Sequence, residues 1–138
     1  MPVRLMRRGA ELSIMSGSTE LMNSRLSGSE EALATLTCAP LAGQAQPRVL
    51  IGGLGMGFTL RAALSELPAK AEVVVAELVP AVAAWARGPM AALFDGCLDD
   101  PRVTLRIADV ALVIGGPMAA PASNLLLGSR DALGETPR

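Results

Sequence analysis

The sequence has no histidine and no tyrosine among its 138 residues, and it has only two cysteines, Cys38 and Cys97. Without histidine, no Ser-His or Cys-His catalytic arrangement can form, so a catalytic base would have to be Asp, Glu or Lys. Two cysteines without histidine cannot by themselves complete a four-ligand zinc site. We therefore expect no metal site and two reduced thiols, which are typical of a cytoplasmic protein.

The sequence also lacks an excess of basic charge and any long apolar run. It has 12 Lys and Arg against 13 Asp and Glu, for a formal net charge of −1. We therefore expect no nucleic-acid partner, because no basic surface is available to hold a phosphate backbone. No apolar segment approaches the ~18 residues of a membrane span, and no apolar stretch follows the charged N-terminus as in a signal peptide. The composition is 51% hydrophobic and 18% charged, which indicates a globular chain of one-domain length.

The first part of the chain predicts a short β segment followed by a helix. Residues 3–7 and 11–15 are strand candidates separated by a turn at Arg8-Gly9, as in a hairpin. Ser27 and Glu30 form a Ser-x-x-Glu capping box, which predicts a helix over about 28–39. We therefore assign residues 1–26 to an N-terminal β-strand segment.

From Arg48 onward, short apolar runs alternate with helical patterns. The predicted strands are 48–51, 72–77 and 102–107, and the predicted helices are 58–67 and 80–87. This alternation is typical of an α/β unit with a parallel sheet. We assign residues 27–114 to this core and residues 115–138 to an irregular C-terminal tail. The tail shows no fourth buried strand, and its acids, Asp131 and Glu135, follow no predicted strand.

A glycine-rich loop lies between the first core strand and its helix. Gly53, Gly55 and Gly57 form a G-x-G-x-G turn, and glycine is needed where φ is positive or where a ligand approaches the backbone. The following helix directs free N–H groups toward the loop. The dinucleotide pattern G-x-G-x-x-G does not fit, because its third glycine would fall at Phe58 or Leu60. The loop favours a nucleoside ligand over NAD, and a tight turn without a ligand is the alternative.

Two acids follow the ends of the next two strands. Glu77 ends the second strand, twenty residues after Gly57, where open α/β sheets place an acid against the ribose hydroxyls. Asp109 lies just beyond the third strand and should face the same crevice. The alternatives are a solvated strand end for Glu77 and a helix N-cap for Asp109.

Three segments of the core resemble the spermidine synthase family. Residues 49–61 (VLIGGLGMGFTLR), 76–82 (AELVPAV) and 99–110 (DDPRVTLRIADV) are similar to the family's VLIIGGGDGGTLRE, VEIDPAV and DDPRVKVIIGDA, in the same order. Residues 20–41 resemble the strand and helix that join the family's N-terminal β-domain to its core. The resemblance implies an incomplete Rossmann-like sheet of the SAM-dependent methyltransferase type, where SAM is S-adenosylmethionine.

The resemblance also implies site residues and a reaction. Gly53, Gly55 and Gly57 would line a nucleoside pocket, Glu77 would bind the ribose, Leu78 would pack on the adenine, and Asp109 would bind the adenine amine. The co-substrate would be SAM or decarboxylated SAM, with no metal. The reaction would transfer an aminopropyl group to a diamine in polyamine biosynthesis.

The sequence departs from the family where the family binds amines. The acid of the family's glycine loop is Met56 here, and the tyrosine and acid of its linking helix fall at Ala32 and Ala34. Val79 occupies the position of the second acid in the family's VEID motif. The family's catalytic Asp-x-x-Asp segment has no counterpart in residues 114–138. We therefore name no catalytic residue and expect impaired aminopropyl transfer.

Two alternatives stay open. A SAM-dependent methyltransferase on the same sheet is favoured by Met56, because the positive helix end prefers the carboxylate of SAM to the lone ammonium of decarboxylated SAM. A non-catalytic nucleoside-binding fragment is the other. In either case, exposed edges of an incomplete sheet favour self-association into a homodimer.

Overall fold

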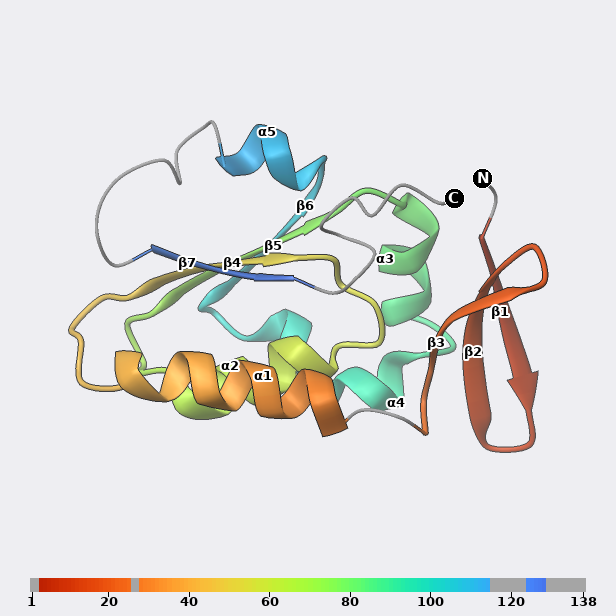
Figure 1. The fold of residues 1–138 in the computed structure, drawn as a ribbon, viewed down its shortest axis with the longest axis horizontal. Coiled ribbons are helices and arrows are strands. Elements are labelled where there is room, and N and C mark those ends of the chain that lie inside the picture. Colours follow the sequence, from red (N-terminus) through yellow and green to blue (C-terminus); the bar gives the residue numbers. More distant parts are fainter. Residues whose placement is uncertain (1–2, 26–27, 115–123, 129–138) are drawn as a thin grey trace.

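A computed structural model describes residues 3–25, 28–114 and 124–128 of the chain. It contains a three-stranded antiparallel sheet near the N-terminus and a four-stranded parallel sheet with helices on its two faces (Figure 1). The parallel sheet and its helices confirm the predicted α/β, Rossmann-like fold.

The N-terminal sheet extends the predicted hairpin by one strand. Its strands are β1 (Val3–Arg8), β2 (Glu11–Ser16) and β3 (Thr19–Asn23), in the order β1-β2-β3. The turn between β1 and β2 contains Gly9 at φ +60°, a conformation that favours glycine. Between β2 and β3 the register shifts, because Ile14 pairs with Met22 whereas Met15 pairs with Glu20. Leu21 is therefore the extra residue of a β-bulge.

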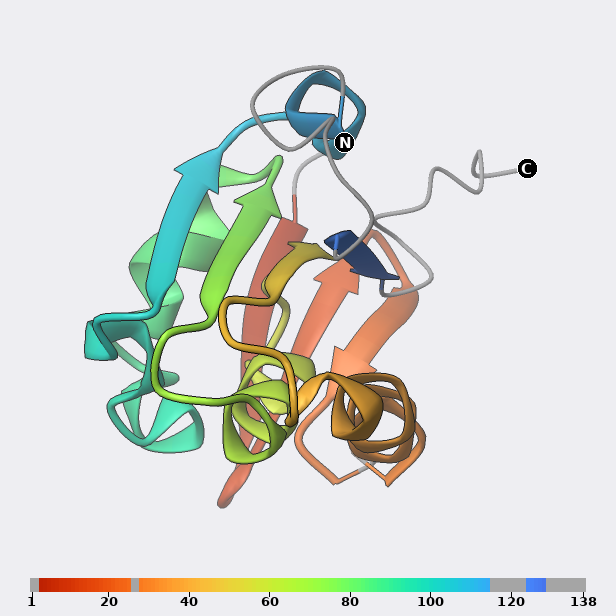
Figure 2. The same ribbon diagram turned by 90° about the vertical axis from the view of Figure 1, so that its left-hand side faces the viewer.

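The second sheet carries the core. Its strands are β4 (Arg48–Gly52), β5 (Glu72–Glu77), β6 (Val103–Ile107) and β7 (Asn124–Gly128), all parallel, in the order β6-β5-β4-β7. The arrows of β4, β5 and β6 point the same way in Figure 2. Strands β4 and β5 are buried on both faces: Val49 and Ile51 belong to one apolar cluster, whereas Leu50 and Val74 belong to another. This explains why their sequences are continuous apolar runs.

Helices α1 (Gly28–Cys38), α2 (Phe58–Glu66) and α3 (Pro80–Ala86) follow the predicted positions closely. The structure adds α4 (Ala91–Phe94) and α5 (Val110–Ile114), with short 3-10 turns η1 (Ala39–Leu41) and η2 (Cys97–Asp99). In Figure 1, α1, α2 and α4 lie on one side of the parallel sheet and α5 on the other. No helix in the described part of the chain is long and apolar enough to cross a membrane. Ser27 of the predicted capping box lies outside the described residues.

The structure corrects the prediction for one part of the tail. Residues 124–128, expected to be irregular, form β7 and pair with β4 from Arg48↔Asn124 to Gly52↔Gly128. A run of three leucines between breakers has no periodicity that distinguishes a strand, and pairing with β4 decides its conformation. Asp131 therefore follows a strand in sequence after all, three residues beyond Gly128. The rest of the predicted tail lies outside the described residues.

The DDPRV segment before β6 has a structural role. Arg102 donates from Nε and Nη2 to the two oxygens of Asp100, at 2.9 and 2.8 Å. Its Nη1 donates to the carbonyl oxygens of Leu64 and Leu67 at 3.0 and 2.9 Å, which joins the start of β6 to the end of α2. The hydrogen bond from Arg102 lowers the pKa of the Asp100 carboxyl below its ordinary value. Asp100 and Arg102 thus fix the position of β6 in the sheet.

Candidate nucleoside-binding site

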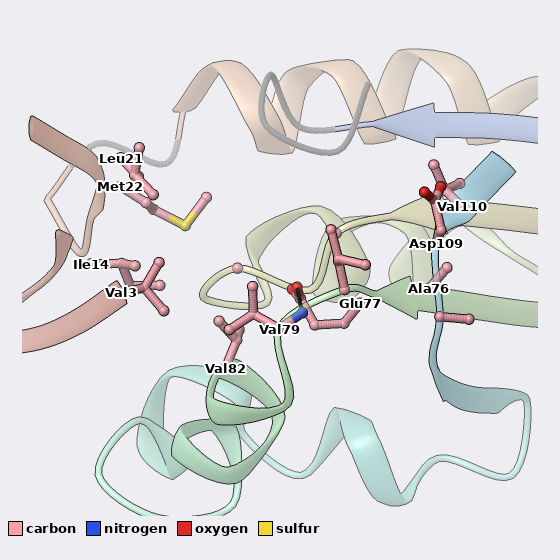
Figure 3. A pocket seen from close by; sticks show the side chains of 14 residues that line it. Val3, Ile14, Leu21, Met22, Ala76, Glu77, Val79, Val82, Asp109 and Val110 are labelled. Carbon is pink, nitrogen blue, oxygen red and sulfur yellow. Dashed lines mark hydrogen bonds between the residues drawn. The ribbon is translucent and has the colours of Figure 1, made fainter. Parts of the chain in front are cut away.

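A cavity of about 240 Å³ opens at the carboxyl ends of the parallel strands, facing the N-terminal sheet (Figure 3). Ligands of open α/β sheets bind at this edge. Its walls come from the N-terminal sheet, the glycine loop, the end of β5 with the start of α3, and the segment that joins β6 to α5. The residues that line it are Val3, Ile14, Leu21, Met22, Gly53, Gly55, Ala76, Glu77, Leu78, Val79, Val82, Ala108, Asp109 and Val110.

The glycine loop requires its three glycines. Gly53, Gly55 and Gly57 have φ values of +97°, +51° and +85°, in the region that side chains disfavour. The Gly53 N–H donates to the carbonyl oxygen of Ala76 at 2.8 Å, which fixes the start of the loop against β5. The left-handed turn expected from the sequence is therefore present.

The glycines differ in what surrounds them. Gly53 and Gly55 line the cavity, whereas Gly57 is buried behind it. A Cβ at Gly57 would lie 2.6 Å from ring carbons of Phe94, so its missing side chain makes room for packing. A Cβ at Gly55 would lie 2.8 Å from Cε of Met22, a residue of the N-terminal sheet.

Glu77 is held at the centre of the cavity wall. Its Oε1 accepts a hydrogen bond from the Leu54 N–H at 2.9 Å, and its Oε2 accepts one from the Val79 N–H at 3.0 Å. The residue is only 8% exposed, so it is not the solvated strand end that the sequence left open. A carboxylate has about four acceptor sites, so each oxygen retains capacity for a further donor. Two ribose hydroxyls would supply such donors.

Leu78 and Asp109 also border the cavity. Leu78 leaves 67% of its surface exposed at the cavity, so its side chain is accessible for contact with a flat ring. Asp109 is exposed and directly precedes α5, where its carbonyl oxygen accepts from the Leu112 N–H at 3.0 Å. It thus takes the N-cap position and lines the cavity at once. In Figure 3, Asp109 and Met22 lie at opposite ends, with Glu77 between them.

The sequence did not reveal the wall that comes from the N-terminal sheet. Val3, Ile14, Leu21 and Met22 reach the cavity from β1, β2 and β3, and the Met22 Sδ accepts a hydrogen bond from the Met56 N–H at 3.2 Å. These contacts join segments more than thirty residues apart, so no local pattern predicts them. Met56, at the position of the family's loop acid, is fully buried in the core.

Neither thiol takes part in this site. Cys38 and Cys97 are free, and burial raises the pKa of each to about 11. Both are therefore neutral thiols near pH 7, with little nucleophilic character. Within residues 3–25, 28–114 and 124–128, no group of three His, Cys, Asp or Glu side chains is placed to hold a metal ion.

The fold is a Rossmann-like parallel sheet of the type found in methyltransferases. No protein-family model matches the chain, and no curated protein matches its sequence. Solved structures do share the fold. A spermidine synthase in complex with the transition-state analogue AdoDATO superposes with a TM-score of 0.63 and 21% identity, covering 81% of this chain and 38% of that one.

Two further structures agree. Spermidine synthase from Thermotoga maritima gives a TM-score of 0.60 and 20% identity over 81% of this chain and 43% of its own. A protein from Klebsiella pneumoniae described as an O-methyltransferase gives a TM-score of 0.51 and 23% identity, over 81% of this chain and 45% of its own. The chain thus has the fold of spermidine synthases, which confirms the resemblance at this level, and it spans less than half the length of these three chains.

Proposed function

We propose that the chain binds the adenosyl group of SAM or decarboxylated SAM, as the nucleoside-binding part of a spermidine synthase-like transferase. The observation that carries the proposal is the geometry of Glu77, a buried carboxylate whose oxygens are oriented by Leu54 and Val79 and border the cavity. Each hydrogen bond from a ribose hydroxyl to such a carboxylate contributes about 1.5–3 kcal/mol. Asp109 would receive the adenine amine, and Leu78 would cover the ring.

The proposed transfer reaction rests on the resemblance and on the shared fold. In this proposal the transferred group is aminopropyl and the acceptor is a diamine of polyamine biosynthesis. The spermidine synthases that share the fold support this assignment, and one of them holds the analogue AdoDATO.

A second candidate is a SAM-dependent methyltransferase, because the glycine loop offers no carboxylate to an ammonium. Met56 is buried, and the described acids that line the cavity are Glu77 and Asp109 alone. The loop therefore lacks the charge that an aminopropyl amine would need. The methyltransferase fold of the protein from K. pneumoniae is compatible with this alternative.

Calorimetric titration tests nucleoside binding. Adenosine and 2′,3′-dideoxyadenosine differ only in the two ribose hydroxyls that we assign to Glu77. We expect adenosine to bind at least about 30-fold more tightly, since 2 kcal/mol corresponds to that ratio. Equal binding of the two nucleosides, or no binding of adenosine, SAM or decarboxylated SAM, would contradict the proposal.

A further inference from the structure

We infer that, among adenosyl ligands, the cavity binds those whose 5′ substituent is short, apolar and uncharged more tightly than SAM or decarboxylated SAM, and that Met22 is a specificity-determining residue. This inference rests on the proposed function, because it assumes that the ribose lies at Glu77 and the adenine near Asp109. The 5′ substituent would then point away from Asp109, toward the end of the cavity formed by Met22 and its neighbours (Figure 3).

The described side chains at that end of the cavity are aliphatic or thioether in character. Val3, Ile14, Leu21 and Met22 form it on the side of the N-terminal sheet, and Val82 joins them from α3. A charged group placed there would lose water and gain no partner of opposite charge, which is costly. Two of the described lining residues are charged, Glu77 and Asp109. We assign them to the ribose and the adenine, away from the end formed by Met22.

Met22 also covers the glycine loop. Its Sδ accepts from the Met56 N–H at 3.2 Å, and Sδ and Cε lie 2.9 and 2.8 Å from the place of a Cβ on Gly55. A backbone N–H that could face a ligand carboxylate is therefore already paired with a thioether. Among the described residues, the loop end of the cavity offers neither a cation for the carboxylate of SAM nor an anion for its amine.

The β-bulge accounts for this arrangement. Successive residues of a regular strand face opposite sides, yet Leu21 and Met22 both line the cavity. The extra residue at Leu21 permits this, and bulges commonly re-aim side chains beside binding sites. The cavity volume of about 240 Å³ lies below the usual range of ~300–1,000 Å³ for ligand pockets, which suits a nucleoside without a long tail.

A comparison of four ligands distinguishes the effect of a charged 5′ tail from the effect of the sulfonium charge. 5′-Methylthioadenosine and S-adenosylhomocysteine are both thioethers, but only the second carries an amino-acid tail; SAM and decarboxylated SAM add the sulfonium. We expect methylthioadenosine to bind the full chain at least about tenfold more tightly than each of the other three, measured by calorimetry. Equal or tighter binding of S-adenosylhomocysteine would overturn the inference and leave nucleoside binding intact.

Variants of the apolar wall identify the responsible residue. M22E should raise the affinity for decarboxylated SAM relative to methylthioadenosine by about tenfold or more, because it supplies a carboxylate beside Gly55. M22L, which conserves volume, should keep the wild-type ranking. If M22E does not fold, L21E at the 37% exposed bulge position serves the same test. If the ratio of the affinities for decarboxylated SAM and methylthioadenosine is unchanged in the folded glutamate variant, the role of this wall is overturned. If the wild type binds no adenosyl ligand, the proposed function is contradicted instead.

Discussion

Gly57 shows at the scale of one residue how the glycine loop serves packing as well as binding. Its φ of +85° is disfavoured for any side chain, and a Cβ would lie 2.6 Å from the ring of Phe94. We predict that G57A lowers the free energy of unfolding by about 1–3 kcal/mol, through backbone strain and overpacking. Denaturation with urea measures the change.

Gly28 provides the matched control for this prediction. It lies at the start of α1, without a positive φ, and nothing lies within 4 Å of its Cβ position. G28A should therefore leave the stability nearly unchanged or raise it slightly. If G57A were as stable as G28A, the result would contradict the close packing of Phe94 against Gly57.

Single residues were also where sequence analysis was most informative. The position of Glu77 at the end of a strand and the three glycines after another followed from spacing alone, and the structure places Gly53, Gly55 and Glu77 at one cavity. Met22 could not be found this way, because its approach to Gly55 depends on how two sheets meet. The burial of Gly57 against Phe94 is likewise a consequence of tertiary packing.

At the scale of elements, the pair of Asp100 and Arg102 fixes β6 to the end of α2. Both side chains are mostly buried, at 22% and 17% exposure. We predict that D100N lowers the free energy of unfolding by about 1–2 kcal/mol near pH 7, because a charge-assisted pair becomes a neutral one. Chemical denaturation of the two proteins at the same pH provides the measurement.

The same pair predicts a pH dependence with a definite sign. Arg102 lowers the pKa of the Asp100 carboxyl below its ordinary value of 3.8, so its stabilisation is complete above that value. The contribution is lost as the pH falls through the lowered pKa. The stability difference between wild type and D100N should therefore be constant above about pH 5 and shrink in more acidic buffer. A difference that grew on acidification would contradict this assignment.

Strands that are continuous apolar runs between turn residues were predicted well, and elements decided by pairing were not. Strands β4 and β5 are buried on both faces, so their apolar runs alone indicated them. Strand β7 depends on β4, a partner far away along the chain, and a short leucine run carries no information about such a partner. The Leu21 bulge depends on a register shift against β2, which the sequence of β3 does not reveal. Strand β3 was indicated only by the resemblance of residues 20–41.

At the scale of the whole molecule, the cavity that we propose for a nucleoside lies in a chain that lacks several acids found where the spermidine synthase family binds amines. Ala32 is exposed and Ala34 is buried where the resemblance places a tyrosine and an acid, and Met56 is buried in the core. These three positions supply no carboxylate to an ammonium, and the described lining of the cavity has no acid besides Glu77 and Asp109 to act as a base on an attacking amine.

We therefore predict that the purified chain is a poor aminopropyltransferase. Formation of methylthioadenosine from decarboxylated SAM and putrescine should proceed about 10²–10⁴-fold more slowly than in an ordinary enzyme, because a positioned base contributes that factor. A chromatographic assay for methylthioadenosine measures the rate, with protein-free substrate as the control. Turnover near ~1 per second would contradict this prediction and would show that the chain does position a catalytic base.

The central claim is that Glu77 binds the ribose of an adenosyl ligand, and the most direct test is the affinity of E77A for methylthioadenosine. Since Glu77 also accepts hydrogen bonds from Leu54 and Val79, circular dichroism must first show that the variant is folded. Calorimetry should then give a loss of about 2–3 kcal/mol relative to wild type, whereas C97S, which alters a thiol outside the cavity, should bind as wild type does. An unchanged affinity in folded E77A would contradict the account.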